Sequence, residues 1–217
     1  MTEAVTLQKD SPYNSPHLKA VLAGNTEVYS DWALDYETDM SAVGFPGPVN
    51  LAAELAKVFA HPNFPFKDNK KIRILDVGAG TGWTAEAVFA AVPNPERLEI
   101  TGADISPEML KQAAAKNIYE KLVQVDLNSD VVSGVFDIVV STGTFALGHV
   151  KLDGLQRIVE NNIGDNGIIM LSCKNTFFEQ VYADKLKEAG WTVEQGKIVI
   201  YGAGDTAELL TISKRPI

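Results

Sequence analysis

The sequence predicts one α/β domain whose mostly parallel sheet is covered on both faces by helices and ends in an antiparallel hairpin. Short apolar runs alternate with helical patterns from residue 72 onward, and parallel neighbours need such crossover connections. Residues 202–205, between the last two runs, are too few for a crossover, so those strands should pair as a hairpin. The length of 217 residues suits one substantial core.

The N-terminal part, residues 1–48, is expected to form an extension and lid before a main domain over residues 49–217. Residues 1–25 are rich in Ser, Pro, Asn and Lys, and two Ser-Pro pairs interrupt any early helix, so we expect a flexible segment or a lid here. Between Thr26 and Met40, aromatic and apolar residues recur near helical spacing, which predicts a helix.

The main domain follows a break at residues 44–48, after which Asn50 can cap a helix over residues 51–59. Apolar runs predict strands near 72–77, 98–103, 122–125, 136–141, 167–173, 192–201 and 206–213. Helical patterns lie near 82–91, 107–116, 152–162 and 176–189. Between Asp126 and Phe136 the chain has room only for a turn or a short helix.

Residues 72–82 carry the clearest functional signal. They read Ile-Arg-Ile-Leu-Asp-Val-Gly-Ala-Gly-Thr-Gly, an apolar strand that ends in an acid and is followed by alternating glycines. The chain must turn sharply at the end of a central strand, and Gly78, Gly80 and Gly82 permit backbone angles and a close ligand approach that a Cβ would forbid. The segment therefore predicts a nucleotide-type cofactor site.

The spacing of these glycines selects the class of ligand. The dinucleotide fingerprint G-x-G-x-x-G, counted from Gly78, needs a glycine where this chain has Trp83. The carboxylate of Asp76 would also lie close to the charges of a pyrophosphate. A ligand that carries an ammonium or sulfonium group suits the segment better.

Two later apolar runs also end in acids. Asp104 follows the glycines by about 20 residues, the offset at which an acid accepts hydrogen bonds from ribose hydroxyls in a βαβ unit. Ser106 can cap the next helix, with Pro107 in its first turn. Asp126 closes a third run, so all three acids should lie at one edge of the sheet.

These segments resemble the motifs of class I S-adenosylmethionine-dependent methyltransferases. The first motif corresponds to residues 75–82, the second to residues 98–110 and the third to residues 122–127. The resemblance implies a Rossmann-like sheet of seven strands ending in an antiparallel hairpin, and it makes the main domain the catalytic one. It also implies S-adenosyl-L-methionine as the cofactor and S-adenosyl-L-homocysteine as the product.

The same resemblance implies cofactor contacts for individual residues. The glycines would shape the methionine side of the pocket, Asp76 would support the cationic end, Asp104 would take the ribose and Asp126 would frame the adenine. The complete implied set is Trp32, Tyr36, Asp76, Gly78, Ala79, Gly80, Gly82, Asp104, Ile105, Asp126, Leu127 and Ser141.

Trp32 and Tyr36 belong to this set because of the segment around them. Their i, i+4 spacing puts both rings on one helix face, which is also what plain packing produces. The segment resembles the Tyr/Trp-Ala-x-x-Tyr stretch of small-molecule methyltransferases, notably the Williams–Beuren-region methyltransferase-like group. In that group an N-terminal helix closes over the cofactor, and a tyrosine hydroxyl can reach its carboxylate.

The methyl acceptor is expected to be a small molecule, methylated on oxygen, nitrogen or sulfur. Residues 141–144 read Ser-Thr-Gly-Thr and lack the Asn/Asp-Pro-Pro-aromatic motif with which related nucleic-acid enzymes hold a flipped base. Cys173 lacks the preceding proline of cytosine-carbon enzymes and should pack in the core. The formal net charge of −9 disfavours DNA or RNA.

His149, just beyond that loop, is the candidate catalytic residue. It could take a proton from the attacking atom, or it could be a structural histidine. A base is optional because the cofactor carries an activated methyl group, so holding the nucleophile in line can supply much of the rate.

Composition bounds the compartment and the partners. One cysteine excludes an intrachain disulfide, no apolar stretch approaches ~18 residues and no secretory signal is visible, so we expect a cytoplasmic protein without a membrane or metal partner. Aminopropyl transfer is a weaker alternative because the 141–144 loop lacks acids, and nicotinamide chemistry is weaker still. A non-catalytic cofactor-binding protein that acts through a partner is the main alternative.

Overall fold

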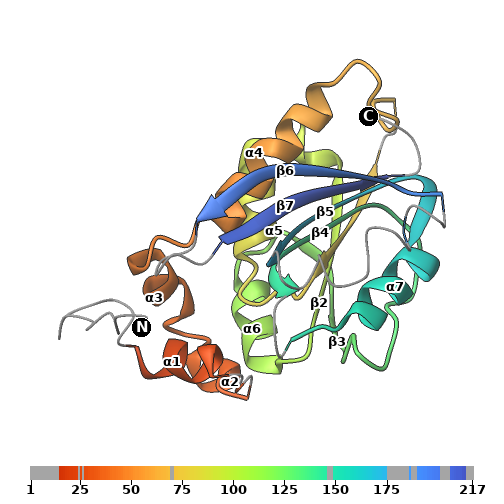
Figure 1. Cartoon of the computed structure of the whole chain (residues 1–217). Coiled ribbons are helices and arrows are strands. Elements are labelled where there is room, and N and C mark those ends of the chain that lie inside the picture. The colour runs from red at the N-terminus through yellow and green to blue at the C-terminus, as the bar shows by residue number, and fades with distance from the viewer. Residues whose placement is uncertain are drawn as a thin grey trace, which may run out of the picture.

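The computed structural model describes residues 15–23, 25, 27–68, 71–145, 149–174, 186, 190–200 and 206–213. Within them lies a seven-stranded sheet with the order β3-β2-β1-β4-β5-β7-β6 (Figure 1). Its strands are β1 (Ile72–Val77), β2 (Leu98–Asp104), β3 (Tyr119–Gln124), β4 (Phe136–Phe145), β5 (Ile163–Lys174), β6 (Thr192–Ile200) and β7 (Thr206–Ser213). The helices are α1 (Pro16–Leu22), α2 (Tyr29–Trp32), α3 (Tyr36–Ala42), α4 (Gly47–Ala60), α5 (Trp83–Ala91), the short 3-10 helix η2 (Pro95–Arg97), α6 (Pro107–Ala115) and α7 (Leu152–Asn161).

The strand directions confirm the predicted sheet. Strands β1 to β5 are parallel, and β7 lies antiparallel between β5 and β6. The segment that joins the last two strands lies outside the described residues, as does nearly all of the helix predicted over 176–189.

The order in which strands are added to the sheet reverses between β1 and β4. Strands β2 and β3 are added on one side of β1, whereas β4 and β5 are added on the other. The connections that leave β1 and β4 therefore diverge to opposite faces of the sheet. Such a point leaves a crevice at the carboxyl ends of the strands, where open α/β sheets bind their ligands.

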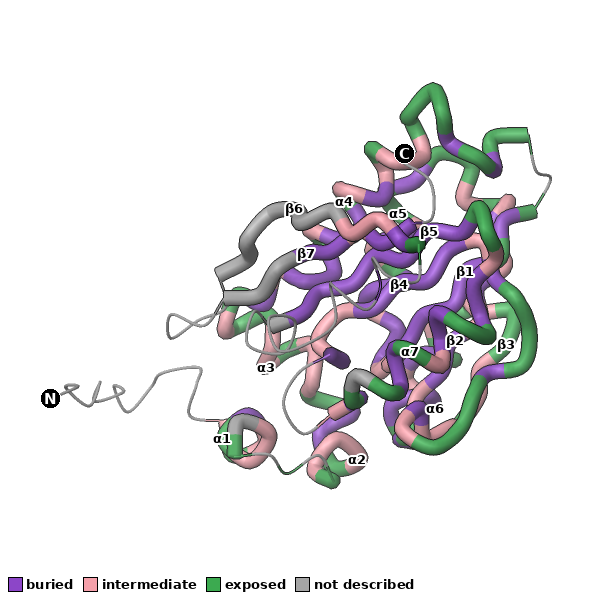
Figure 2. Tube along the Cα trace, turned by 45° about the vertical axis from the view of Figure 1, so that its right-hand side comes forward, coloured by how far each residue is buried: buried purple, intermediate pink, exposed green. Residues whose placement is uncertain are grey.

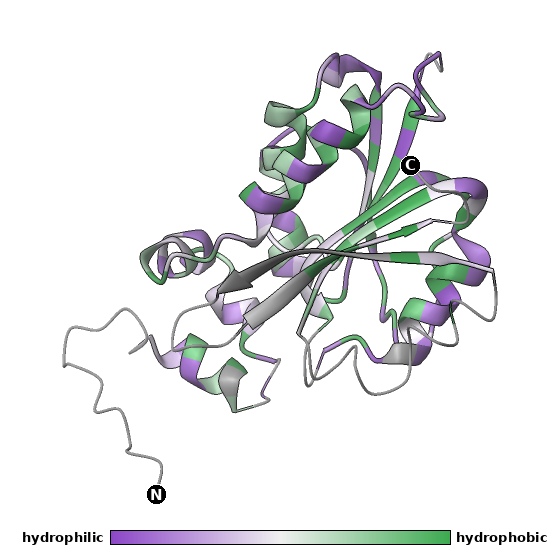
Figure 3. Ribbon diagram, turned by 45° about the horizontal axis from the view of Figure 1, so that its top comes forward, coloured by the Kyte–Doolittle hydropathy of each residue, from purple (hydrophilic) through white to green (hydrophobic). Residues whose placement is uncertain are grey.

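Both faces of the sheet are buried, which explains why its strands read as continuous apolar runs. Helices α4 and α5 cover one face through Leu51, Leu55 and Val88. Helix α7 covers the other through Leu155 and Ile158. Figure 2 shows that β1, β4 and β5 are buried between these helical layers. Figure 3 shows that the central strands are mainly hydrophobic, whereas the helices around them carry both hydrophilic and hydrophobic residues.

Three predicted strands have different limits in the structure. Strand β3 begins at Tyr119 rather than at residue 122, because an edge strand tolerates polar residues such as Glu120 and Lys121 that interrupt an apolar pattern. Strand β4 continues through its small residues to Phe145, and β5 begins earlier, at Ile163. The turn between Asp126 and Phe136 is as expected.

The N-terminal prediction was wrong in its details. Pro16 begins α1 instead of breaking it, since proline is favoured in the first turn of a helix. Two short helices, α2 and α3, replace the single helix expected between Thr26 and Met40. Helix α4 begins at Gly47, four residues before the expected start and with proline in its first turn. The proposed division between residues 48 and 49 falls inside this turn and stays a prediction.

Two other features concern the core and the membrane. Cys173 is 1% exposed in β5 and belongs to the core on the α7 side, as expected. Of the helices in the described ranges, none is both long and apolar enough to cross a membrane.

Truncation of Leu55 tests the packing of α4 on the sheet. Leu55 is fully buried, so Leu55→Ala should lower the free energy of unfolding by about 2–5 kcal/mol through lost burial and a cavity. Val49 lies on the same helix and is 62% exposed, so Val49→Ala should change it by less than about 0.5 kcal/mol. Urea unfolding measures both, and equal losses would contradict the described orientation of α4.

Candidate functional site

A cavity of about 140 Å³ lies at the carboxyl ends of β1, β2 and β4. The loop after β1 contributes Gly78 and Gly80, and the end of β2 contributes Asp104 and Ile105. The segments after β3 and around the end of β4 add Asp126, Leu127, Thr142, Gly143, Thr144 and His149, and the N-terminal helices add Tyr29 and Tyr36. The position is the crevice that the sheet topology favours.

The glycines of the loop after β1 serve different purposes. Gly78 has a φ of +66°, and a Cβ there would lie 2.0 Å from Thr144 Oγ1, so packing against β4 demands glycine. Gly80 has a φ of +54°, but a Cβ there would meet only a carbonyl oxygen at 3.9 Å. The bare side of Gly80 therefore faces open space, where a ligand can approach the backbone.

The carboxylate of Asp104 fastens this loop to β2. Its Oδ2 accepts a hydrogen bond from the Gly80 amide at 2.8 Å, and its Oδ1 accepts one from the Ser106 amide at 2.9 Å. Burial raises the pKa of Asp104, whereas these amides, that of Ile105 and the His149 charge act to lower it. Each carboxylate oxygen keeps acceptor capacity for a further donor, such as a ligand hydroxyl.

The remaining cavity wall offers an apolar surface beside polar groups. Ile105 is 59% exposed although it is apolar, and its side chain lines the cavity. Leu127 lies in the same wall, next to Asp126, whose Oδ1 accepts from the Asn128 amide at 2.9 Å. An exposed aliphatic side chain next to polar groups fits the face and edge of a planar ring.

Asp76 lies behind the loop and does not line the cavity. Its side chain is 1% exposed, Oδ2 accepts from the Tyr119 hydroxyl at 2.7 Å, and Oδ1 has no hydrogen-bond partner among the described residues. Burial raises the pKa of Asp76 from 3.8 to about 7, with a smaller rise from Asp104, and the hydrogen bond from Tyr119 opposes these effects.

Sequence reasoning missed Tyr119, which begins an edge strand and belongs to no motif. A signal was present in Gly102, because a glycine inside a strand often marks the close approach of another group. A Cβ at Gly102 would lie 2.7 Å from the Tyr119 ring. The ring reaches across β2 at the point where β2 has no side chain.

The N-terminal helices close over the cavity through an aromatic cluster. Trp32 and Tyr36 make an edge contact at 4.9 Å between ring centroids, across the break between α2 and α3. Trp32 is 1% exposed and stacks with both His17 and Tyr29, so it supports the wall while Tyr29 and Tyr36 line it.

Tyr29 joins the N-terminal helices to His149. Their side chains form a hydrogen bond of 2.9 Å between the hydroxyl and Nε2. Burial and the nearby Asp104 raise the pKa of Tyr29, so the phenol stays protonated at neutral pH. The sequence places Tyr29 in a helical pattern but gives no sign of this contact.

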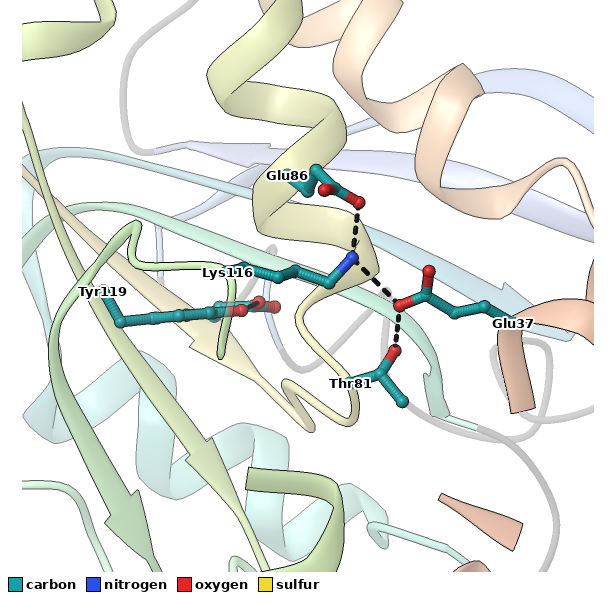
Figure 4. A network of polar contacts seen from close by, with 6 residues as sticks. Glu37, Thr81, Glu86, Lys116 and Tyr119 are labelled. Atoms are coloured by element: carbon teal, nitrogen blue, oxygen red, sulfur yellow. Dashed lines mark hydrogen bonds and ion pairs between the residues drawn. The ribbon is translucent and has the colours of Figure 1, made fainter. Parts of the chain in front are cut away.

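A second contact, made by Glu37 of α3, fastens the N-terminal helices to the glycine loop. The Glu37 carboxylate accepts from Thr81 Oγ1 at 2.6 Å and pairs with the Lys116 ammonium at 3.0 Å. Lys116 also pairs with Glu86 of α5 (Figure 4). The network links three separate segments around the loop.

Several residues of the expected cofactor set lie outside the cavity lining. Ser141 is fully buried and donates to the Val77 carbonyl at 2.7 Å, which joins β4 to β1. Gly82 caps α5 in a left-handed conformation, and Ala79 is buried. Direct cofactor contacts of these residues, and of Trp32 and Asp76, stay predictions.

Comparisons with known proteins agree with this architecture. Residues 74–162 match the family of methyltransferase domains. The chain is 29% identical over 177 residues to Methyltransferase-like protein 27 of Homo sapiens, across 80% of this chain and 67% of the human protein.

Two solved structures share the fold. The plantazolicin methyltransferase BpumL in complex with SAH superposes with a TM-score of 0.60 at 15% identity, covering 94% of this chain and 93% of that one. A DhpI-SAH complex gives 0.58 at 16% identity, covering 91% and 98%.

Asp76 should make the stability of the protein depend on pH. A carboxyl whose pKa is higher in the folded than in the unfolded protein stabilises the fold at low pH, and that contribution is lost as pH rises from about 4 to about 7. Asn at this position has no charge to lose or gain, so Asp76→Asn is free of this loss of stability. The free energy of unfolding of the variant minus that of wild type should therefore increase by roughly 3–4 kcal/mol from pH 4 to pH 8. Urea unfolding at several pH values tests this, and parallel curves would contradict it.

Proposed function

We propose that this chain, which is a class I S-adenosylmethionine-dependent methyltransferase, moves the methyl group to an oxygen, nitrogen or sulfur atom of a small-molecule acceptor. The observation that carries the proposal is the arrangement of Asp104 and the open side of Gly80 around one cavity. We place this activity in the cytosol, since the one cysteine of the chain excludes an intrachain disulfide.

The residues around the cavity fit each part of the cofactor. The open backbone at Gly80 suits the methionine end, and the carboxylate of Asp104 suits the two ribose hydroxyls. Ile105 and Leu127 offer an apolar surface for the adenine, with Asp126 as an acceptor at its edge. The bound cofactor supplies a methyl group on a positively charged sulfur.

A small acceptor suits the walls of the cavity. Tyr29 and Tyr36 line it from the N-terminal helices, and Thr142 and Thr144 line it on the β4 side. None of the residues described as lining it is a lysine or an arginine. A covered cavity without cationic side chains favours a compact metabolite over a nucleic acid.

His149 is our candidate for the general base. It lines the cavity, and its Nε2 lies 2.9 Å from the Tyr29 hydroxyl, which lines the same cavity. In the proposed reaction the acceptor attacks the methyl carbon, the bond from carbon to sulfur breaks and the proton of the acceptor passes to His149. The protein contributes orientation and exclusion of water in addition.

Cofactor binding is the first test. Asp104→Ala should weaken the binding of S-adenosylmethionine and S-adenosylhomocysteine by about ten-fold or more, ~1.4 kcal/mol, because the ribose loses its acceptor. Asp104→Asn keeps one acceptor and should lose less, and Asp153→Ala, an exposed acid on α7, should bind as wild type. Isothermal titration measures all four proteins. If wild type bound neither compound, the proposal would be wrong.

His149 is tested once a metabolite panel yields an acceptor that supports turnover. His149→Gln should lower kcat/KM by about 10²–10⁴ if the imidazole takes the proton. Its affinity for S-adenosylhomocysteine should change by less than about three-fold, a shift below 1 kcal/mol. Full activity of the variant would show that His149 is not the general base. The rate would then come from positioning of the acceptor, and the role of His149 would be structural.

A further inference from the structure

Tyr119 is held across the sheet behind the proposed cofactor site. It begins β3, whereas the acid it contacts lies on β1, with β2 between them. Its ring passes over Gly102 of β2, and a Cβ at Gly82 of the glycine loop would lie 3.0 Å from it. The ring is therefore fixed between the sheet and the loop, with its hydroxyl on Asp76.

The contact leaves Asp76 only half satisfied. Oδ2 accepts from Tyr119, whereas Oδ1 is buried without a hydrogen-bond partner in the described part of the chain. The ammonium of Lys116 pairs with Glu37 and Glu86 (Figure 4). A buried carboxylate in this condition gains from any positive charge brought close to it.

We propose that Tyr119 is a positioning residue for the cofactor, because it holds the Asp76 carboxylate in the orientation and charge state that offset the positive charge of the bound ligand. The inference rests on the proposed cofactor site. Tyr119 lies outside the motifs, and its hydroxyl should strengthen cofactor binding more at pH 7 than at pH 9.

The electrostatics of the pair support this role. The donation from Tyr119 lowers the pKa of Asp76, which burial and Asp104 raise to about 7. Burial and Asp76 raise the pKa of Tyr119 in turn, with smaller effects from Asp104 and Glu86, so its hydroxyl stays protonated and can donate. Without the hydroxyl, Asp76 would be mostly protonated at neutral pH and would attract a cation less.

Tyr119→Phe isolates the hydroxyl, because phenylalanine keeps the ring against Gly102 and Gly82. We would measure the affinity for S-adenosylmethionine by isothermal titration from pH 6 to pH 9, for wild type and variant. Because loss of the donation raises the pKa of Asp76, the variant should bind several-fold more weakly than wild type at pH 7, and the difference should largely disappear at pH 9, where Asp76 is ionised in both proteins. Titration of the ligand affects both proteins equally and cancels in the ratio.

Asp76→Asn provides the matched background. This substitution removes the charge that Tyr119 is proposed to maintain. The ratio of the affinity of Asp76→Asn to that of the double variant Asp76→Asn/Tyr119→Phe should therefore not vary with pH. Thermal unfolding of each variant checks that it is folded. If Tyr119→Phe does not fold, the ratio of wild type to Asp76→Asn gives the second readout and should grow as pH rises from 6 to 9.

The outcomes separate this inference from the proposed function. A wild-type protein that binds no cofactor at any pH would overturn the function and the inference together. A wild-type protein that binds, with a variant ratio constant across pH, would leave the function in place and assign Tyr119 a packing role only.

Discussion

The hydrogen bond from the Gly80 amide to the Asp104 carboxylate ties the loop after β1 to the end of β2, together with the bonds from the Gly78 and Ala79 amides to the Ala103 carbonyl, and the shape of the cavity depends on these ties. The loop contains glycines at positive φ, and the hydroxyl of Thr81 bonds to Glu37 of the N-terminal helices rather than to the sheet. The acid on the neighbouring strand supplies the anchor and still faces the cavity. One carboxylate therefore both shapes the site and remains able to receive a ligand.

The carboxylate of Asp76 has a different environment from that of Asp104. Asp76 is more deeply buried and accepts a hydrogen bond from a tyrosine hydroxyl, whereas Asp104 accepts from three backbone amides. Burial raises the pKa of Asp76 to about 7, so its ionisation at neutral pH costs stability that an uncharged side chain would not cost. Proteins commonly tolerate such local costs at functional sites, where a ligand removes them.

The sequence predicts the central strands well because both faces of the sheet are buried and leave continuous apolar runs, as in residues 168–171 of β5. It predicts the acids and glycines of the cavity because chain order alone places them at strand ends. It could not locate the start of β3, where an edge position permits Glu120 and Lys121. Nor could it find Tyr29 or Tyr119, since their contacts arise from packing between segments distant in the chain.

The N-terminal helices contain Trp32, which is buried, stacks with His17 and Tyr29, and donates from Nε1 to Asp39 at 2.9 Å. Any separation of these helices from the cavity would expose this indole to water. The chain has three tryptophans, so in a variant that retains only Trp32 the intrinsic fluorescence comes from this indole alone. The aromatic cluster thereby provides a signal, without an added dye, for any separation of the N-terminal helices from the cavity.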